Sequence, residues 1–315
     1  MKFFAFVFPG QGSQSVGMLD AWGDHPAVRA TLVEASDALG EDLGAMIAQG
    51  PKEALALTTN TQPVMLAAGV ACWRAWRAEG GALPAAVAGH SLGEYSALVA
   101  AEALTLADAV PLVRLRAAAM QDAVPVGAGA MAAVLGLEAE KVIAGCADAT
   151  RRMGQDGEVV EAVNFNDPSQ TVIAGSKAAV DKACAVLKEM GAKRALPLPV
   201  SAPFHCSLMK PAAERLKAAL QLVPVSAPKM AVVNNIDVAL ENDPVRIRDA
   251  LYRQAFGAVR WVECVRKMAS LGVGAVVECG PGKALTGMTR RIDPALTGAA
   301  LYDPATLAEV KTLLA

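Results

Sequence analysis

The sequence predicts an α/β fold, in which a domain with a short parallel sheet is interrupted by a smaller inserted subdomain. Three observations lead to this prediction. Short apolar runs alternate with longer helical segments, as in sheets that are covered by helices on both faces. One of these runs leads into a glycine–serine turn at residues 89–93, which a helix follows. Between residues 127 and 199 the order of elements changes to βαββαβ.

The composition limits the class of protein. The chain has 315 residues, of which 54% are hydrophobic and 4% aromatic, so its core is built mainly from alanine and aliphatic side chains. A net charge of −2 argues against a nucleic-acid-binding protein, which usually carries a basic excess. The apolar run at residues 3–8 is too short for a signal peptide, and no run approaches the roughly 20 apolar residues of a membrane-spanning helix. We therefore expect a cytoplasmic protein that binds neither nucleic acid nor a membrane.

The cysteines show neither a disulfide framework nor the spacing of metal ligands. They form no C-x-x-C pair, and we expect reduced, mostly buried thiols and no bound metal. The six positions are Cys72, Cys146, Cys184, Cys206, Cys264 and Cys279.

The first predicted strand, residues 3–8, ends in the turn Pro9-Gly10-Gln11-Gly12-Ser13-Gln14. The turn does not match a dinucleotide fingerprint, because position 15 is serine where the third glycine is needed, and it has no P-loop lysine. At the carboxyl end of a strand in an open α/β sheet, its glycines let the backbone or the Gln11 side chain approach a bound group. A simple tight turn is the alternative.

A nucleophile elbow is predicted at Gly89-His90-Ser91-Leu92-Gly93, between the apolar run 85–88 and the alanine-rich helix 94–104. The glycines allow a turn too tight for Cβ atoms, which pushes the hydroxyl of Ser91 out at the apex. The amide of Leu92, at the start of the helix, then points toward an oxyanion that forms on Ser91. An ordinary turn is the alternative. With this elbow, residues 1–126 and 200–315 are predicted to form an α/β-hydrolase-like catalytic domain.

Helices are predicted over most of residues 26–82, with breaks at Gly40, Gly50-Pro51 and Gly80-Gly81. Within this stretch, Thr61-Gln62-Pro63 is predicted to start an apolar helix at residues 64–76.

An arginine lies on the apolar face of the helix predicted for residues 105–122. At about 100° per residue, Arg116 falls within the arc that Leu112, Met120 and Val113 form. A guanidinium in apolar surroundings keeps its proton and needs an anionic partner. The pattern indicates an anion site, with a structural ion pair or a side chain that reaches solvent as the alternatives.

Residues 127–199 are predicted to form a ferredoxin-like subdomain with the order βαββαβ. Its polar stretch, residues 151–157, is expected to be a surface loop. After it, the first domain resumes with a helix at residues 210–222, strands at 230–234 and 273–279, and a helix at 283–292 that follows the break Gly280-Pro281-Gly282.

The base that a serine nucleophile needs is assigned to His205. His90 lies within the elbow and is poorly placed to reach back to Ser91, and His25 precedes a proline at a surface-like helix start. His205 follows the serine in the chain, as in elbow enzymes. A packed histidine is the alternative. No aspartate stands out as a third member, so a full triad and a Ser–His dyad oriented by a carbonyl both agree with the sequence.

Several motifs together resemble the malonyl-CoA:acyl-carrier-protein transacylase family, the acyltransferases of fatty acid and polyketide synthases. Single motifs of this kind are common, but the set is specific, and its order and spacing agree from residue 3 to about residue 292. The motifs are Gly10-Gln11-Gly12-Ser13-Gln14, Gly89-His90-Ser91-Leu92-Gly93-Glu94, Arg116, Asn164-Phe165-Asn166, Pro203-Phe204-His205 and Gly280-Pro281-Gly282.

The resemblance implies a ping-pong transfer of a malonyl group. Ser91, activated by His205, attacks malonyl-CoA, and the phosphopantetheine thiol of holo acyl carrier protein then takes the group from the serine. The backbone amides of Gln11 and Leu92 would hold the oxyanion, and Arg116 would pair with the free malonyl carboxylate. No bound cofactor is implied.

The family also suggests which groups orient the histidine and shape the pocket. The main-chain carbonyl of Gln254 would orient the catalytic histidine. Phe204 favours malonyl over methylmalonyl, because related domains that load malonyl tend to carry Phe before that histidine. Asn166 is a further candidate for the pocket.

Other functions remain open from the sequence. The same site would serve a freestanding acyltransferase of a polyketide synthase or a malonate decarboxylase system. A serine esterase shares the elbow and the histidine, but a buried cation facing the acyl pocket is unexpected for neutral esters. An inactive scaffold is a further alternative, but it would not be expected to retain the nucleophile, the base and the carboxylate-binding arginine together. We expect the protein to be a monomer. Some basic residues could bind the acidic helices of the carrier protein or could simply be solvated at the surface; they include Lys188, Lys193, Arg194, Lys283, Arg290 and Arg291.

Overall fold

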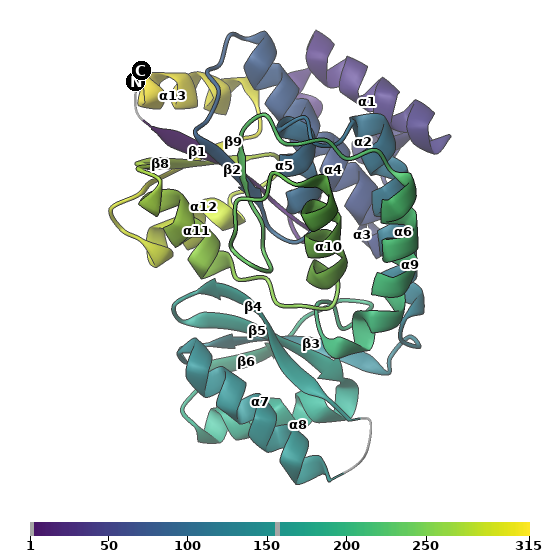
Figure 1. The fold of residues 1–315 in the computed structure, drawn as a ribbon, viewed down its shortest axis with the longest axis vertical. Helices are drawn as coiled ribbons and strands as arrows, with labels where there is room; N and C mark the ends of the chain where they lie inside the picture. Colours follow the sequence, from purple (N-terminus) through teal and green to yellow (C-terminus); the bar gives the residue numbers. More distant parts are fainter. Residues whose placement is uncertain (1–2, 155–157) are drawn as a thin grey trace.

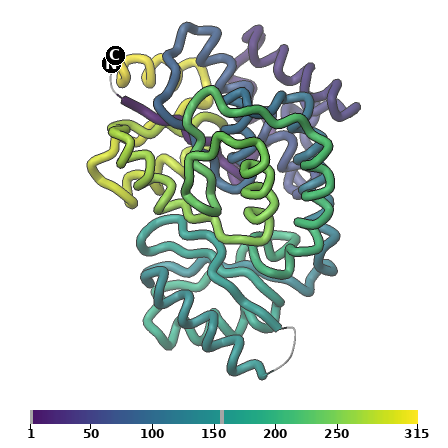
Figure 2. The backbone as a smooth tube through the Cα atoms, in the orientation of Figure 1, coloured from purple at the N-terminus to yellow at the C-terminus, as the bar shows by residue number. Residues whose placement is uncertain are grey.

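Two β-sheets organise the structure, a computed structural model that describes residues 3–154 and 158–315 (Figure 1). A parallel sheet lies in the upper part of Figure 1 among most of the helices, and an antiparallel sheet lies in the lower part. Figure 2 shows the chain passing into the lower part (teal) and returning from it (green). The predicted α/β fold class is confirmed.

The parallel sheet contains β1 (Phe4–Phe8), β2 (Ala86–Gly89), β7 (Ala231–Val233), β8 (Ala275–Cys279) and β9 (Thr297–Leu301). Its strand order is β7-β2-β1-β8-β9, and all neighbours are parallel. Every residue of β1, β2 and β8 is buried, as expected when helices cover both faces of a sheet. From β1 the chain first adds strands on one side of the sheet (β2, β7) and then on the other (β8, β9). Open α/β sheets place their ligand-binding sites at the carboxyl ends of the strands near such a point.

Helices pack on both faces of this sheet, and alternate residues of β1 point to each face. Phe4, Phe6 and Phe8 pack in a core with α4, α5 and α6, whereas Ala5 and Val7 pack in a second core with α11 and α12. The helices around the sheet are α1 (Pro26–Leu39), α2 (Leu43–Gln49), α3 (Lys52–Ala56), α4 (Thr58–Ala78), α5 (Gly93–Ala100), α6 (Leu106–Asp122), α9 (Lys210–Leu222), α10 (Pro244–Gln254), α11 (Trp261–Ser270), α12 (Ala284–Ile292) and α13 (Pro304–Leu314), with short 3-10 helices η1 (Asp20–Trp22) and η2 (Ser207–Met209).

Helix α4 begins earlier than predicted. It starts at Thr58 and runs through Pro63, where the sequence predicted that Thr61-Gln62-Pro63 starts the helix of residues 64–76. Pro63 is the sixth residue of α4, and its missing N–H removes a single intrahelical hydrogen bond, the one to the carbonyl of residue 59. As a result Gln62 lies on a helix, and its side chain is buried.

Helix α5 ends earlier than predicted, at Ala100 instead of residue 104. Glu102 adopts a left-handed backbone conformation with φ of 59°, which an α-helix does not contain. The hydroxyl of Thr105 then accepts a hydrogen bond from the amide of Asp108 and so caps α6.

The antiparallel sheet has the predicted order βαββαβ. Its elements are β3 (Gly129–Leu135), α7 (Ala139–Met153), β4 (Val160–Asp167), β5 (Gln170–Ser176), α8 (Lys177–Glu189) and β6 (Arg194–Pro197), and the strand order is β4-β5-β3-β6. Residues 151–153 of the predicted polar loop belong instead to the last turn of α7, and residues 155–157 lie outside the described residues. The domain boundaries at residues 127 and 199 stay a prediction.

The two sheets are joined by main-chain and side-chain contacts. The amide of Phe165 in β4 donates to the carbonyl of Val259, and the amide of Val259 donates to the carbonyl of Val163. Nearby, Nε of Arg291 in α12 lies 2.7 Å from a carboxylate oxygen of the buried Asp167. These contacts fix one edge of the antiparallel sheet against the helices of the parallel sheet.

Among the described residues, none of the helices has the length and apolar character needed to cross a membrane.

Candidate active site

The predicted elbow forms between β2 and α5. Ser91 has a positive φ of 52°, a strained conformation for a residue with a side chain. Gly89 and Gly93 make the turn sterically feasible: a Cβ on Gly89 would lie 1.9 Å from backbone atoms of Gly93, and one on Gly93 would lie 2.1 Å from the carbonyl oxygen of Phe8. The hydroxyl of Ser91 therefore stands at the carboxyl end of β2, as the sequence predicted.

His205 and Ser91 lie within hydrogen-bond distance, although 114 residues separate them in the chain. The Ser91 Oγ and His205 Nε2 atoms are 2.6 Å apart, and His205 Nδ1 is 2.9 Å from the main-chain oxygen of Gln254. A carbonyl oxygen can only accept, so Nδ1 carries the proton and Nε2 is free to accept the proton of the serine. The arrangement is a Ser–His dyad oriented by a carbonyl, one of the two arrangements that the sequence left open.

His205 is held in its neutral form. Its side chain is buried, and burial, followed by the positive charge of Arg116, lowers the pKa of His205 to about 3. The imidazole is therefore unprotonated at neutral pH, and its Nε2 atom can accept a proton.

Arg116 lies beside the nucleophile in the interior. Its Nη1 donates to Oε1 of Gln62 at 2.6 Å, and its Nη2 donates to Ser91 Oγ at 3.1 Å and to Oε1 of Gln254 at 3.2 Å. The guanidinium carbon lies 5.6 Å from the ring centroid of Tyr95. These hydrogen-bond partners are neutral, so within residues 3–154 and 158–315 the buried cation has no direct carboxylate contact, and it is suited to an anionic group beside Ser91.

A cavity of about 130 Å³ opens at the nucleophile. The predicted oxyanion residues Gln11 and Leu92 line it, and within the described part of the chain neither of their backbone N–H groups has a hydrogen-bond acceptor. The remaining lining residues are Gln62, His90, Ser91, Arg116, Met120, Met131, Asn164, Val172, Leu198, Val200, Phe204 and His205. Across residues 3–154 and 158–315, no three His, Cys, Asp or Glu side chains are grouped to hold a metal ion.

The two predicted pocket residues have different positions. Phe204 lines the cavity, as expected from its place before His205. Asn166 does not line it; its Oδ1 instead accepts a hydrogen bond of 2.9 Å from Nε2 of His90, and Asn164 takes the position at the cavity wall. In a regular strand residues 164 and 166 would point to the same face of the sheet. The bulges in β4 disturb that alternation, and the two asparagines therefore have different surroundings.

Asn235 supports the elbow and was not expected from the sequence. Its side-chain Oδ1 accepts from the amide of Ser91 at 2.8 Å, and its Nδ2 donates to the carbonyl of Gly89 at 2.8 Å. It follows β7, the neighbour of β2 in the sheet. A pair of asparagines directly after an apolar strand is the signal that could have indicated it.

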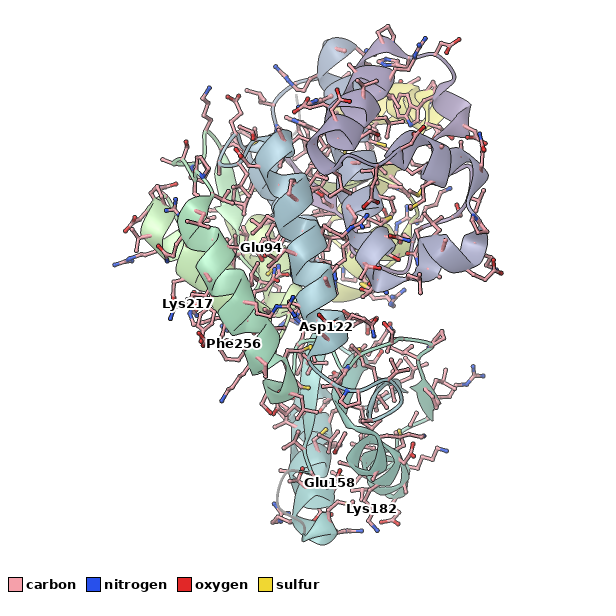
Figure 3. The ribbon with its side chains drawn as sticks, turned by 90° about the vertical axis from the view of Figure 1, so that its right-hand side faces the viewer. Glu94, Asp122, Glu158, Lys182, Lys217 and Phe256 are labelled. Carbon is pink, nitrogen blue, oxygen red and sulfur yellow. The ribbon has the colours of Figure 1, made fainter. Side chains whose placement is uncertain are left out.

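Glu94 links the elbow to the histidine support. One carboxylate oxygen accepts from the amide of Asn235 and from Nε2 of Gln254, each at 2.9 Å, and that same Nε2 donates to the carbonyl of Ser91 at 3.0 Å. In the view of Figure 3, Glu94 lies between α6, which ends at Asp122, and α9, which carries Lys217. Burial raises the pKa of Glu94 to about 7. Gln254 thus connects three groups: its side chain contacts Ser91 and Arg116, its main-chain oxygen contacts His205, and Glu94 holds its amide nitrogen.

The fold and this arrangement of side chains are those of an acyltransferase. Residues 5–293 match the family model described as "Acyl transferase domain".

Relatives place the chain more narrowly. A malonyl CoA-acyl carrier protein transacylase of Salmonella typhimurium is 53% identical over 99% of this chain and 100% of its own length, and one of Bacillus subtilis is 41% identical over 98% and 96%. The chain belongs to the malonyl CoA-acyl carrier protein transacylase family.

Solved structures agree with this assignment. The crystal structure of an acyl-carrier-protein S-malonyltransferase from Burkholderia pseudomallei has a TM-score of 0.96 and 63% identity, covering 99% of this chain and 100% of that one. A malonyl-transacylase in complex with its type II PKS acyl-carrier protein has a TM-score of 0.93 and 50% identity, covering 97% of each chain.

Proposed function

We propose that this protein transfers a malonyl group from coenzyme A to the phosphopantetheine thiol of acyl carrier protein, through a malonyl ester of Ser91, and so supplies fatty acid biosynthesis. The observation that carries the proposal is the position of Arg116: a buried guanidinium 3.1 Å from the nucleophilic oxygen. This cation fits an acyl group that ends in a carboxylate.

The acylation step uses the dyad. His205 Nε2 takes the proton of Ser91 as its oxygen attacks the thioester carbonyl, and the oxyanion that forms lies against the amides of Gln11 and Leu92. When the carbonyl reforms, the C–S bond breaks, and the proton on His205 passes to the leaving thiolate of coenzyme A. The products are coenzyme A and malonyl-Ser91.

The second step repeats the chemistry with a different nucleophile. The carrier thiol loses its proton to His205 and attacks the ester of Ser91, and the same two amides hold the second oxyanion. The C–O bond then breaks, and His205 returns the proton to the serine. The carrier leaves as the malonyl thioester, with no bound cofactor required.

Selection among acyl groups follows from Arg116 and Phe204. Malonyl supplies a carboxylate for the guanidinium, whereas acetyl would leave the buried cation beside a methyl group. Phe204 at the cavity wall narrows the space beside the α-carbon and so favours malonyl over methylmalonyl. A neutral ester gains nothing from the buried cation, which argues against a general serine esterase.

Intact-protein mass spectrometry tests the proposal. Brief exposure to malonyl-CoA should add one malonyl group to the protein, and holo acyl carrier protein should then remove it as malonyl-carrier. Ser91→Ala should form no adduct while keeping the wild-type melting temperature. An adduct on the Ser91→Ala protein would exclude Ser91 as the nucleophile, and an adduct that water releases as fast as the carrier does would indicate a hydrolase.

We also infer that residues 127–199 form a subdomain inserted into a catalytic domain of residues 1–126 and 200–315. In support, the strands between residues 129 and 197 form one sheet. Together with the helices of the same stretch they pack around a core of their own, which includes Val134, Ile173 and Leu187. The monomeric state and the cytoplasmic location stay predictions from the sequence.

A further inference from the structure

We propose that Thr58 is a positioning residue, whose hydroxyl couples the arginine that binds the acyl carboxylate to the loop that carries Gln11. The inference rests on the proposed function, because it concerns how two parts of that acyl site are aligned. It assigns a role in acyl transfer to a residue at the start of α4, away from the dyad.

A continuous row of hydrogen bonds joins these groups. Thr58 Oγ1 is 2.7 Å from Oε1 of Gln11 and 3.3 Å from Nε2 of Gln62. Oε1 of Gln62 is in turn 2.6 Å from Nη1 of Arg116, whose Nη2 is 3.1 Å from Ser91 Oγ. The row therefore runs from an exposed loop to the nucleophile.

The arginine fixes the direction of every hydrogen bond in the row. A guanidinium has donors and no acceptor, so it must face the carbonyl oxygen of the Gln62 side chain. The amide nitrogen of Gln62 then faces Thr58 as a donor. The hydroxyl of Thr58 accepts that bond and directs its own hydrogen to Oε1 of Gln11. Each of the three inner members is buried: Thr58 is 1% exposed, and Gln62 and Arg116 are each 2% exposed.

The loop that holds Gln11 benefits from such a tie. Gln11 is exposed and lies between Gly10 and Gly12, and Gly12 has a φ of 115°, so little in the local sequence restricts the loop. The amide of Gln11 must nevertheless keep a fixed position to hold an oxyanion. The hydrogen bond to Thr58 anchors the side chain of Gln11 to a buried helix start.

Among the described residues, the hydroxyl of Thr58 makes no hydrogen bond to the main chain of its own helix. The cap of α4 has no side-chain hydrogen bond, and Thr58 Oγ1 instead contacts two side chains, Gln62 in the same helix and Gln11 in the loop. Thr61 in the same helix shows the ordinary alternative: it is equally buried, but its hydroxyl donates to the carbonyls of Leu55 and Leu57. Thr61 therefore offers a matched control for the loss of a buried threonine hydroxyl.

The test is the rate constant of acylation by malonyl-CoA in a single turnover, with the burst amplitude measured in the same experiment. The amplitude counts folded active sites, whereas the rate constant reports how well those sites are aligned. Thr58→Val should lower the rate constant about twofold to tenfold, the effect expected for one lost hydrogen bond. Thr58→Ser retains the hydroxyl and should restore the rate constant, and Thr61→Val should leave it unchanged.

A second comparison tests the coupling itself. In Gln62→Leu the connection from Thr58 to Arg116 is already broken, so adding Thr58→Val should slow acylation by less than it slows the wild type. The inference is overturned by a wild-type rate constant in Thr58→Val, by a Thr58→Ser variant as slow as Thr58→Val, or by additive effects in the double variant. Failure of the proposed function looks different, because the wild-type protein would then show no malonyl burst.

Discussion

Replacement of Arg116 by alanine should change substrate selection more than it changes the nucleophilic chemistry. The guanidinium donates hydrogen bonds to Gln62, Ser91 and Gln254, so its loss has two separate consequences. Loss of the contact with Ser91 affects the transfer of every acyl group. Loss of the contact with a substrate carboxylate affects malonyl alone.

The size of the selective effect follows from the proposed contact. A hydrogen bond to a charged group contributes about 1.5–3 kcal/mol, and 1.4 kcal/mol corresponds to a factor of 10 in kcat/KM. The ratio of kcat/KM for malonyl-CoA to that for acetyl-CoA should therefore fall about 10-fold to 150-fold in Arg116→Ala. The carbonyl oxygens of the Gln62 and Gln254 side chains lose a donor, so the variant should also be less stable.

Steady-state kinetics with both thioesters measure this ratio, and the ratio is independent of the folded fraction. Arg114→Ala is the matched control, because Arg114 lies on the same helix and pairs with Glu41 outside the cavity. Its ratio should equal that of the wild type. If Arg116→Ala lowers kcat/KM for both thioesters by one factor, the arginine supports the fold or the coenzyme A moiety, and our account of selectivity is wrong.

Three further predictions concern His205. His205→Ala should slow acylation about 10² to 10⁴-fold, the usual effect of losing a general base, whereas His25→Ala should have little effect; equal losses would mean that His205 is the wrong histidine. Because burial lowers the pKa of His205 to about 3, the pH profile of kcat/KM should show no inflection near 6.5 that belongs to this group. Glu94, whose pKa is about 7, could also produce an inflection near that pH, so the profile should be measured again in Glu94→Gln, which lacks this carboxyl. An inflection near 6.5 that persists in Glu94→Gln would contradict a neutral, buried His205. Between pH 6.5 and 3 the native state binds fewer protons at His205 than the unfolded state does, so this group should lower the free energy of unfolding as the pH falls through that window.

The sequence indicated the reactive groups better than it indicated their supports. Ser91 could be predicted because a nucleophile elbow has a local pattern of glycines, and Arg116 because a cation on an apolar arc conflicts with its surroundings. Gln62 has no such local pattern, and the only signal for Asn235 is its place in a pair of asparagines after an apolar strand. Their roles depend on which strand lies beside β2 and on where α4 begins, and both are properties of the tertiary structure.

The start predicted for α4 was wrong for a related reason. The stretch Thr61-Gln62-Pro63 was interpreted as the helix start, but α4 begins at Thr58 and continues through Pro63. With the start placed three residues too late, the sequence did not indicate that the first residue of α4 contacts Gln11. An early helix start is difficult to detect when, as here, the capping position is Leu57, which has no side chain able to cap.

Different parts of the chain supply the wall of the cavity and the reacting groups, so acyl preference and catalytic rate depend on different residues. Met131, Asn164, Val172 and Leu198 belong to the antiparallel sheet or to the segment that follows it, and none of them takes part in proton transfer. Ser91, Arg116 and the amides of Gln11 and Leu92, to which we assign the reaction, all come from the parallel-sheet part of the chain. We therefore expect substitutions in the antiparallel sheet to change which acyl groups fit while the reacting atoms keep their positions. In an enzyme of this architecture, we expect the acyl preference to change without a loss of catalytic rate.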